Sequence, residues 1–421
     1  MLSRCVRCEV IALSLVALIL AIALYPLSQW DEDIAWSTRI DARLLDHVMP
    51  RPSFNLCYLL AILLGTHRPE ASRYIMSWVA AAVDISYVSS GDHTVAGVPV
   101  RLYRPARVDE TASLPVLVFY HGGGYVTGTL RNYDASLARW CDESGFAVVS
   151  VNYRLAPEHI YPAAFDDCLA VTKSILGDPA VAAELRVNSS LVSVGGDSAG
   201  GSLAAAISLH IGRTDLPRLR AQISIYPAIR YVFSDPNTTF SFSAPGGLDP
   251  KATFLYRSWY LGGEEDADTL RSMVTNRSPV LLPTEVWENA SLRLNGSDVE
   301  LITPDPDKYP YAEKFLSESL CPILARDLSM VPPTIILLAG IDPLYSDGFL
   351  YQQRLQAAGV EAQLVDYGKQ IHGFFANAPS NMTVMGVRFV YGNQEARDAI
   401  SRSVTFVLEH SGLSWEPTPV S

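Results

Sequence analysis

From about residue 85 onward, the sequence alternates short apolar runs rich in β-branched residues with stretches of helical character, such as residues 202–211 and 347–358. Continuous apolar runs indicate strands buried on both faces, and helical stretches between them indicate parallel crossovers. Right-handed crossovers then predict an α/β fold in which helices cover both faces of a mostly parallel sheet. The eight predicted strands are residues 85–90, 98–105, 115–120, 146–153, 191–195, 221–226, 334–340 and 362–367, the first two forming an antiparallel pair.

Two regions depart from this alternation. Residues 28–84 are helix-prone and contain the apolar run 56–64, which predicts either a buried helix or cap helices that line a ligand entrance or rest on a membrane. Residues 228–319 are rich in Pro, Gly, Asn and aromatic residues and separate the sixth and seventh predicted strands. We therefore predict an α/β domain over residues 85–421, with a cap insertion at about 228–319 above the ligand-binding edge of the sheet.

Composition limits the classes of protein that this chain can represent. Its 421 residues are 49% hydrophobic and 18% charged, which is enough for a large core and argues against general disorder. The net charge of −12 and the absence of a basic run argue against nucleic-acid binding. The six cysteines show no zinc-ligand spacing, so we expect neither a metal nor a cofactor, and disulfide pairing and oligomeric state stay open.

The N-terminus has the features of a membrane anchor. Residues 10–24 are apolar except for Ser14, and interfacial residue types extend this run to residue 27. Two arginines precede the run and three acidic residues follow it, which predicts a cytosolic tail at residues 1–9 and a luminal or exterior remainder. The alternative is a cleaved signal peptide in a secreted protein, because residues 21–23 read Ala-Ile-Ala. We favour an uncleaved type II anchor at residues 10–27.

Sequons for N-glycosylation agree with this topology. All of them follow the apolar segment, as expected for a chain whose body enters the secretory lumen. The candidate acceptors are Asn188, Asn237, Asn276, Asn289, Asn295 and Asn381.

A nucleophile motif follows the fifth predicted strand. The sequence Gly196-Asp197-Ser198-Ala199-Gly200 matches G-x-S-x-G and precedes a helical stretch. In a strand–turn–helix context this pattern exposes a serine hydroxyl on a tight turn, and the two glycines leave room for that turn. A serine hydroxyl is a weak nucleophile that needs a base, while the amide of Ala199 can donate to an oxyanion. Ser198 is therefore the candidate nucleophile.

A glycine run follows the third predicted strand, in the sequence His121-Gly122-Gly123-Gly124. Without side chains, the backbone amides of such a run can approach a substrate oxygen closely. The position after a strand, upstream of the serine motif, is that of an oxyanion loop. We therefore expect the oxyanion hole to involve Gly122, Gly123, Gly124 and Ala199.

The base must be a histidine, and only His210, His372 and His410 follow Ser198. His210 lies on the helix that leaves the serine turn and is expected to point away, and His410 ends a C-terminal amphipathic helix, where we expect it to be solvated. His372 lies just beyond the last predicted strand, where a loop at the carboxyl edge of the sheet can hold it near the serine. We assign the base role to His372.

The orienting acid is also expected after a strand end. Asp342 comes two residues after the predicted strand 334–340 and suits this role. Asp347 is the main competitor, but it is expected near the start of the next helix, and Asp366 lies inside the last predicted strand. The resulting order Ser198, Asp342, His372 is that of α/β-hydrolases and differs from the orders in chymotrypsin and subtilisin.

These motifs resemble the hormone-sensitive-lipase branch of the α/β-hydrolases, and most closely its membrane-anchored arylacetamide deacetylase and neutral cholesterol ester hydrolase group. The resemblance runs from about residue 100 and includes the 153–167 stretch as well as the motifs above. It implies Ser198, Asp342 and His372 as the triad, and Gly123, Gly124 and Ala199 as oxyanion donors. It also implies a carboxylic ester hydrolase in the endoplasmic reticulum membrane that faces the lumen and acts in lipid metabolism.

The expected activity is therefore hydrolysis of lipophilic or acetylated esters through an acyl-enzyme at Ser198. Two alternatives remain open: an amidase or arylacetamide deacetylase with the same triad, and a non-catalytic adhesion or receptor protein with a hydrolase fold. The expected partners are the substrate and, through the N-terminal helix, the lipid bilayer.

Overall fold

The computed structural model describes residues 83–230, 248, 250–262, 314, 317–378, 380–384, 387–391 and 393–414. The expected tail, the anchor at residues 10–27, almost all of the 28–84 segment and most of the 228–319 insertion lie outside these residues. Of the helices that are described, none combines the length and apolar character needed to cross a bilayer.

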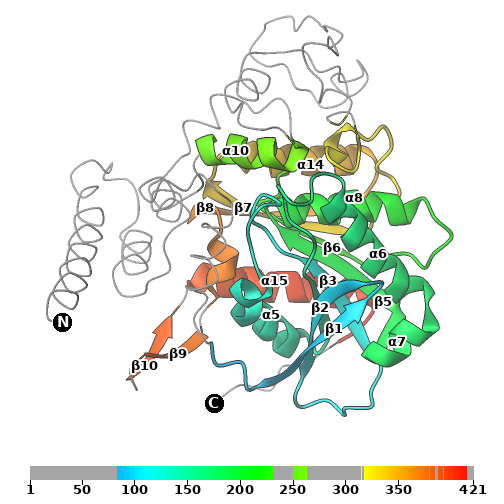
Figure 1. Cartoon of the computed structure of the whole chain (residues 1–421), viewed down its shortest axis with the longest axis vertical. Coiled ribbons are helices and arrows are strands. Elements are labelled where there is room, and N and C mark those ends of the chain that lie inside the picture. The colour runs from blue at the N-terminus through cyan, green and yellow to red at the C-terminus, as the bar shows by residue number, and fades with distance from the viewer. Residues whose placement is uncertain are drawn as a thin grey trace, which may run out of the picture.

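The described chain is built around one eight-stranded sheet with the order β1-β2-β4-β3-β5-β6-β7-β8 (Figure 1). β1 pairs antiparallel with β2 and β2 with β4, whereas all other neighbours are parallel. The prediction of a mostly parallel eight-stranded sheet is thus confirmed. The strands are β1 (Val88–Val95), β2 (Val98–Pro105), β3 (Leu114–Tyr120), β4 (Ala147–Val151), β5 (Val187–Asp197), β6 (Gln222–Ile225), β7 (Thr334–Ile341) and β8 (Ala362–Ile371).

Helices cover both faces of this sheet. Helices α5 and α15 pack on one face, and α6, α7, α8 and α14 pack on the other (Figure 1). The helices are α5 (Leu130–Ser144), α6 (Ala163–Gly177), α7 (Pro179–Leu185), α8 (Ala199–Gly212), α10 (Pro250–Leu261), α14 (Tyr345–Ala357) and α15 (Gln394–Ser411), with 3₁₀ turns η2 (Pro322–Leu324) and η3 (Phe374–Asn377).

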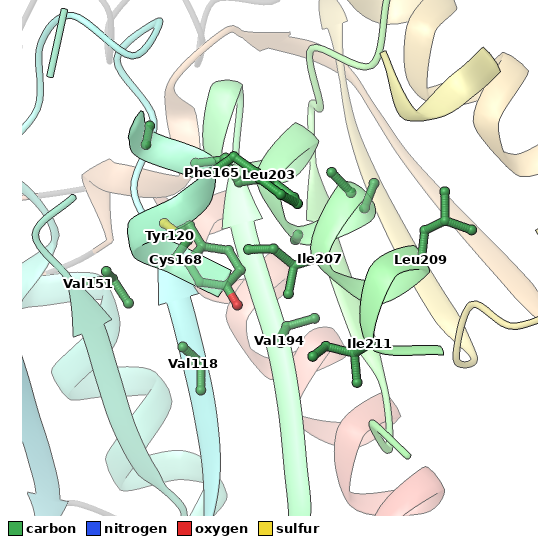
Figure 2. Packing of buried hydrophobic residues seen from close by; sticks show 14 of the residues in the cluster. Val118, Tyr120, Val151, Phe165, Cys168, Val194, Leu203, Ile207, Leu209 and Ile211 are labelled. Atoms are coloured by element: carbon green, nitrogen blue, oxygen red, sulfur yellow. The ribbon is translucent and has the colours of Figure 1, made fainter. Parts of the chain in front are cut away.

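The two faces of the sheet form two separate hydrophobic cores. Along β3, Val116 and Val118 belong to one core while Leu117 and Phe119 belong to the other, as the alternation of side chains in a strand requires. On α8, Leu203, Ile207 and Ile211 recur every four residues and face the strands (Figure 2). Because α8 is buried almost all round, its packing fixes the position of its first residues relative to the sheet.

Two elements add to the predicted architecture. The strands β9 (Ser380–Val384) and β10 (Val387–Tyr391) form an antiparallel pair that was not predicted from the sequence. Helix α10 lies within the predicted cap insertion and beyond the carboxyl ends of β7 and β8 (Figure 1). Its Tyr260 stacks on Tyr125 with ring centroids 4.0 Å apart, and its backbone carbonyl accepts from the amide of Tyr161. α10 therefore packs on the loop that follows β3.

Candidate active site

Ser198 sits on a sharp turn between β5 and α8. Its φ of 54° and ψ of −119° are rare for a residue with a side chain, and such a strained position persists only when its surroundings enforce it. The backbone is held on both sides, since Ser198 N–H donates to the Ile225 carbonyl and its own carbonyl accepts from Ala228. A Cβ at Gly200 would overlap the carbonyl of Tyr120, and one at Gly196 would overlap the carbonyl of Gly200. Both glycines of the motif are therefore required by close backbone packing.

Asp342 and His372 lie within hydrogen-bonding reach of this serine. Nε2 of His372 is 2.9 Å from Oγ of Ser198, and Nδ1 of His372 is 2.7 Å from Oδ2 of Asp342. Ser198 follows β5, Asp342 follows β7 and His372 follows β8, so the carboxyl ends of parallel strands bring them together. With Nδ1–H donating to the carboxylate, Nε2 is free to accept the proton of the serine hydroxyl. The structure thus assembles the three residues in the arrangement of a nucleophile, a base and an orienting acid.

The Asp342 carboxylate is completely buried, and both of its oxygens are used. Oδ2 faces the imidazole, and Oδ1 accepts from the amide of Leu344 at 2.8 Å. On its other side the imidazole ring of His372 lies against the ring of Tyr226, with centroids 4.6 Å apart. These contacts fix the orientation of both groups.

The glycine run after β3 forms a tight turn. The Gly123 carbonyl accepts from the amides of Val126 and Thr127, and φ is 112° at Gly123 and 62° at Gly124, values that favour glycine. Within the described part of the chain, the amides of Gly123, Gly124 and Ala199 have no protein acceptor. These three amides are therefore available to a substrate oxygen.

Gly122 departs from the expectation that it is an oxyanion donor. Its amide donates to Oδ1 of Asp197 at 2.7 Å and approaches the Tyr133 hydroxyl at 3.0 Å. A buried amide that already has a carboxylate acceptor does not turn toward a substrate, since this would leave Oδ1 of Asp197 without its donor. Gly122 instead ties the oxyanion loop to the nucleophile turn.

Asp197 accepts the hydrogen bonds that hold the oxyanion loop against the nucleophile turn. Its buried carboxylate also accepts from the hydroxyls of Tyr133 at 3.0 Å and Tyr226 at 3.3 Å. Burial raises the pKa of Asp197 to about 6, although the hydrogen bonds from Tyr133, Gly122 and Tyr226 oppose this rise. Neither tyrosine was predicted from the sequence. Tyr226 ends a predicted strand and could have been found on that ground, whereas Tyr133 gives no comparable signal.

His121 also holds the oxyanion loop in place, through a hydrogen bond to its backbone. It is fully buried, its Nδ1 bonds the Gly122 carbonyl at 2.8 Å, and its ring stacks on Tyr153 with centroids 4.2 Å apart. The Tyr153 hydroxyl donates to the His121 carbonyl at 2.6 Å. Burial lowers the pKa of His121 to about 4, so the imidazole is neutral at physiological pH.

The other candidate bases and acids lie elsewhere. His210, on α8, packs edge-on against Phe165 of α6. His410 was expected to be solvated, but its side chain is only 16% exposed because it packs on Phe406 and approaches Glu361. Asp347 lies at the start of α14 as expected, where it pairs with Arg230. Asp366 accepts from the Tyr345 hydroxyl at the surface.

Two of the six candidate glycosylation sites fall on described residues. Asn188 lies at the start of β5, half-buried, and its side chain accepts from the Ser190 amide. Asn381 lies on β9. The other four, Asn237, Asn276, Asn289 and Asn295, lie outside the described residues. Among the described residues, no cluster of three potential metal ligands occurs.

Comparison with known proteins places these features in context. Residues 117–286 and 306–376 match the family model described as alpha/beta hydrolase fold. Carboxylesterase NlhH of Mycobacterium tuberculosis is 33% identical over 277 residues, covering 66% of this chain and 71% of that protein. Arylacetamide deacetylase-like 3 of Homo sapiens is 30% identical over 325 residues, covering 72% and 78%. The hyperthermophilic esterase of Pyrobaculum calidifontis superposes with a TM-score of 0.60 at 26% identity, covering 83% of this chain and 97% of that one.

Proposed function

The chain belongs to the α/β-hydrolase-fold family and is a serine carboxylic ester hydrolase, and we propose that Ser198, His372 and Asp342 are its catalytic residues. The observation that carries the proposal is the continuous pair of hydrogen bonds, 2.9 Å from Ser198 to His372 and 2.7 Å from His372 to Asp342. Each member can then perform the role that its chemistry permits.

In the acylation half-reaction, Ser198 Oγ attacks the ester carbonyl carbon while its proton passes to Nε2 of His372. The oxyanion that forms accepts hydrogen bonds from the free amides of Gly123, Gly124 and Ala199. Asp342 stabilises the imidazolium and holds its Nδ1–H in place. The imidazolium then protonates the leaving alcohol as the carbon–oxygen bond breaks, which leaves the acyl-enzyme.

In the deacylation half-reaction, water takes the place of the alcohol. His372 accepts a proton from the water, whose oxygen attacks the acyl carbon, and the same amides hold the second oxyanion. Collapse of this intermediate breaks the bond to Ser198 Oγ, which recovers its proton from the imidazolium. The carboxylic acid leaves and the enzyme returns to its starting state.

Labelling with a fluorophosphonate probe tests the assignment directly. We expect the parent to be labelled at one site and Ser198→Ala not to be labelled. A matched control is Ser202→Ala, which removes another serine of the same helix end while leaving the proposed nucleophile in place. Undiminished labelling of Ser198→Ala would overturn the nucleophile assignment.

Lipophilic or acetylated esters are the proposed substrates. The aromatic side chains of α10 beside the oxyanion loop support a lipophilic ligand. The names of two relatives, arylacetamide deacetylase-like 3 and, from Rattus norvegicus, neutral cholesterol ester hydrolase 1, support acetyl and lipid esters as substrates. A chain-length series of nitrophenyl esters, with matched amides, separates an esterase from an amidase. Equal turnover of matched amides would favour the amidase alternative.

The proposed location is the endoplasmic reticulum membrane, with the catalytic domain in the lumen. What supports it is the apolar segment at residues 10–27, its flanking charges and the six sequons that follow it. Of those sequons, Asn381 on an added hairpin suits a glycan better than Asn188, whose side chain is engaged at the start of β5.

A further inference from the structure

Asp347 was the alternative candidate for the orienting acid, but in the structure it pairs with Arg230. It forms a buried ion pair with Arg230, in which Nε of Arg230 donates to Oδ1 at 2.7 Å and the backbone amide of Arg230 donates to Oδ2 at 3.0 Å. The guanidinium also donates to the Ser346 hydroxyl at 2.6 Å. Arg230 is 8% exposed and Asp347 is 2% exposed, so the pair is shielded from water.

One side of this pair is rigidly connected to the catalytic acid. Asp342 and Asp347 belong to one short turn, in which the Asp342 carbonyl accepts from the amide of Tyr345 and the Leu344 carbonyl accepts from the amide of Asp347. The Asp342 carboxylate itself accepts from the amide of Leu344. A shift of Asp347 therefore carries Asp342 with it.

The other side is connected to the nucleophile. The segment that runs from the end of β6 to Arg230 holds both backbone groups of Ser198, through the Ile225 carbonyl and the Ala228 amide. The same segment contributes Tyr226, whose ring lies against the imidazole of His372. The Arg230 carbonyl in turn accepts from Arg257 of α10 at 2.8 Å. Arg230 thus contacts the turn that carries Asp342 and helix α10, and it belongs to the segment that supports Ser198.

We propose that the Arg230–Asp347 pair is a positioning device of the active site, which fixes the Asp342 turn against the segment that supports Ser198. The proposal rests on the proposed triad. Ser198 and Asp342 are carried by different strands, and the imidazole of His372 bridges them through bonds of 2.9 and 2.7 Å. A displacement of about 1 Å in such an array can cost about 10²-fold in rate. A buried pair joining the two carriers limits that displacement.

A role in fold stability alone would be a weaker explanation for this pair. Desolvation of two charges offsets most of their attraction, so a buried ion pair often contributes little net stability compared with apolar residues of the same size. What the pair does provide is a defined geometry, because the planar guanidinium bonds the carboxylate and the Ser346 hydroxyl at once. Lysine can keep the charge but cannot reproduce this fork.

Arg230→Lys and Asp347→Asn test the proposal in the full chain. The fluorophosphonate probe gives the number of competent sites from its endpoint, and turnover of a nitrophenyl ester is divided by that number. We expect kcat per labelled site to fall by about 10- to 100-fold with KM within about twofold, and labelling to reach the parent endpoint more slowly. Arg213→Lys, in the exposed pair with Glu318, is the matched control and keeps the parent kcat.

Unchanged kcat per labelled site in both variants would overturn the proposal, and so would a change confined to KM. Loss of folding lowers the labelling endpoint instead of kcat per site and is thereby separated from a positioning effect. If both variants fail to fold, Ser346→Ala tests the proposal, because it removes one hydrogen bond of the guanidinium without leaving a charge unpaired. We then expect a several-fold loss of kcat per labelled site. Turnover at the parent level would refute the positioning role of the pair. Failure of the proposed function is distinct, since it would appear as labelling that survives Ser198→Ala.

Discussion

At the scale of single residues, the orientation of one imidazole decides whether Ser198 can be activated. The buried carboxylate of Asp342 accepts a hydrogen bond from Nδ1–H of His372, which leaves Nε2 without a proton and 2.9 Å from the serine hydroxyl. Any change that reverses the protonated nitrogen would remove the base while leaving every atom close to its place.

Asp342→Asn makes that change. The asparagine amide can donate to Nδ1, so the proton moves to Nε2 and the imidazole cannot accept the serine proton. We expect kcat for a nitrophenyl ester to fall by about 10⁴-fold, with the fold retained. Asp366→Asn is the matched control, since Asp366 lies within β8 at the surface, where it accepts from the Tyr345 hydroxyl. An Asp342→Asn enzyme within tenfold of the parent would contradict the assignment of the acid.

Gly200→Ala tests the packing of the nucleophile turn. A methyl group at this position would collide with the carbonyls of Tyr120, the last residue of β3, and of His121, which are backbone atoms and cannot rotate away. We expect a loss of about 3 kcal/mol of stability, the upper part of the range for overpacking, together with loss of labelling. Gly368→Ala, where a Cβ meets nothing within 4 Å, is expected to keep stability and labelling. Equal unfolding midpoints for the two variants would refute this account.

At the scale of elements, the oxyanion loop depends on a buried neutral histidine. His121 has a pKa of about 4 in the fold, against 6.5 in an unstructured chain, because burial penalises its charged form. Between these values the unfolded chain binds a proton that the folded chain does not bind. The stability that His121 permits is therefore complete above about pH 6.5 and is lost as the pH falls toward 4.

The expected loss across this window is about 3 kcal/mol, at 1.36 kcal/mol for each pKa unit. Urea unfolding of the parent and of His121→Gln at a series of pH values measures this loss as the difference between their slopes, because the raised pKa of Asp197 contributes to both profiles with the opposite sign. The stability difference between parent and variant therefore narrows on acidification. His159→Gln, at an exposed histidine, keeps the parent slope. A parent and a His121→Gln variant with parallel pH profiles would show that His121 is not the titrating group.

Helix α10 supplies a second prediction at this scale. Tyr256 lies so close to the oxyanion loop that a Cβ built on Gly124 would be 2.8 Å from its Cδ2. Removing this ring opens space beside a proposed oxyanion donor. For Tyr256→Ala we expect the kcat/KM of longer acyl esters to rise about tenfold relative to the acetyl ester, as one added pocket contact is worth about 1–3 kcal/mol. Tyr256→Phe keeps the ring and the parent ratio, and an unchanged ratio in Tyr256→Ala would place the acyl group elsewhere.

Features that depend on local sequence patterns could be predicted, whereas features that depend on contacts between residues distant in the chain could not. The eight strands were predicted because their apolar runs are local, and Ser198, Asp342 and His372 could be selected because each follows a strand that ends at the same edge. Gly122 was misassigned because its amide is engaged by Asp197, 75 residues away in the chain. The Arg230–Asp347 pair spans 117 residues, and nothing in the local pattern around either residue indicates it. Among the described strands, β9 and β10 pair with each other and not with the main sheet, so they lack the crossover signal that marked the other strands.

At the scale of the whole molecule, the catalytic groups gather at the carboxyl edge of one sheet, while α10 packs beside them (Figure 1). Three of the chain's cysteines, Cys141, Cys168 and Cys321, are buried free thiols, and burial raises the pKa of Cys141 and Cys168 well above the usual value. Thiols in this state react slowly, because the thiolate is the reactive form. These three thiols are therefore compatible with the proposed oxidising compartment without a disulfide among them.

The last prediction concerns that compartment. In cells that glycosylate secreted proteins, we expect the full chain to stay in the membrane pellet after alkaline carbonate extraction, because we propose that its apolar segment at residues 10–27 spans the bilayer. Its catalytic domain is expected to resist external protease in sealed microsomes, and treatment with an endoglycosidase is expected to lower its apparent mass. The control replaces residues 1–27 with a cleavable signal peptide; it keeps the mass shift and the ester hydrolysis but moves to the soluble lumenal fraction. Release of the parent by carbonate would favour the secreted alternative, and digestion by external protease without any mass shift would reverse the proposed orientation.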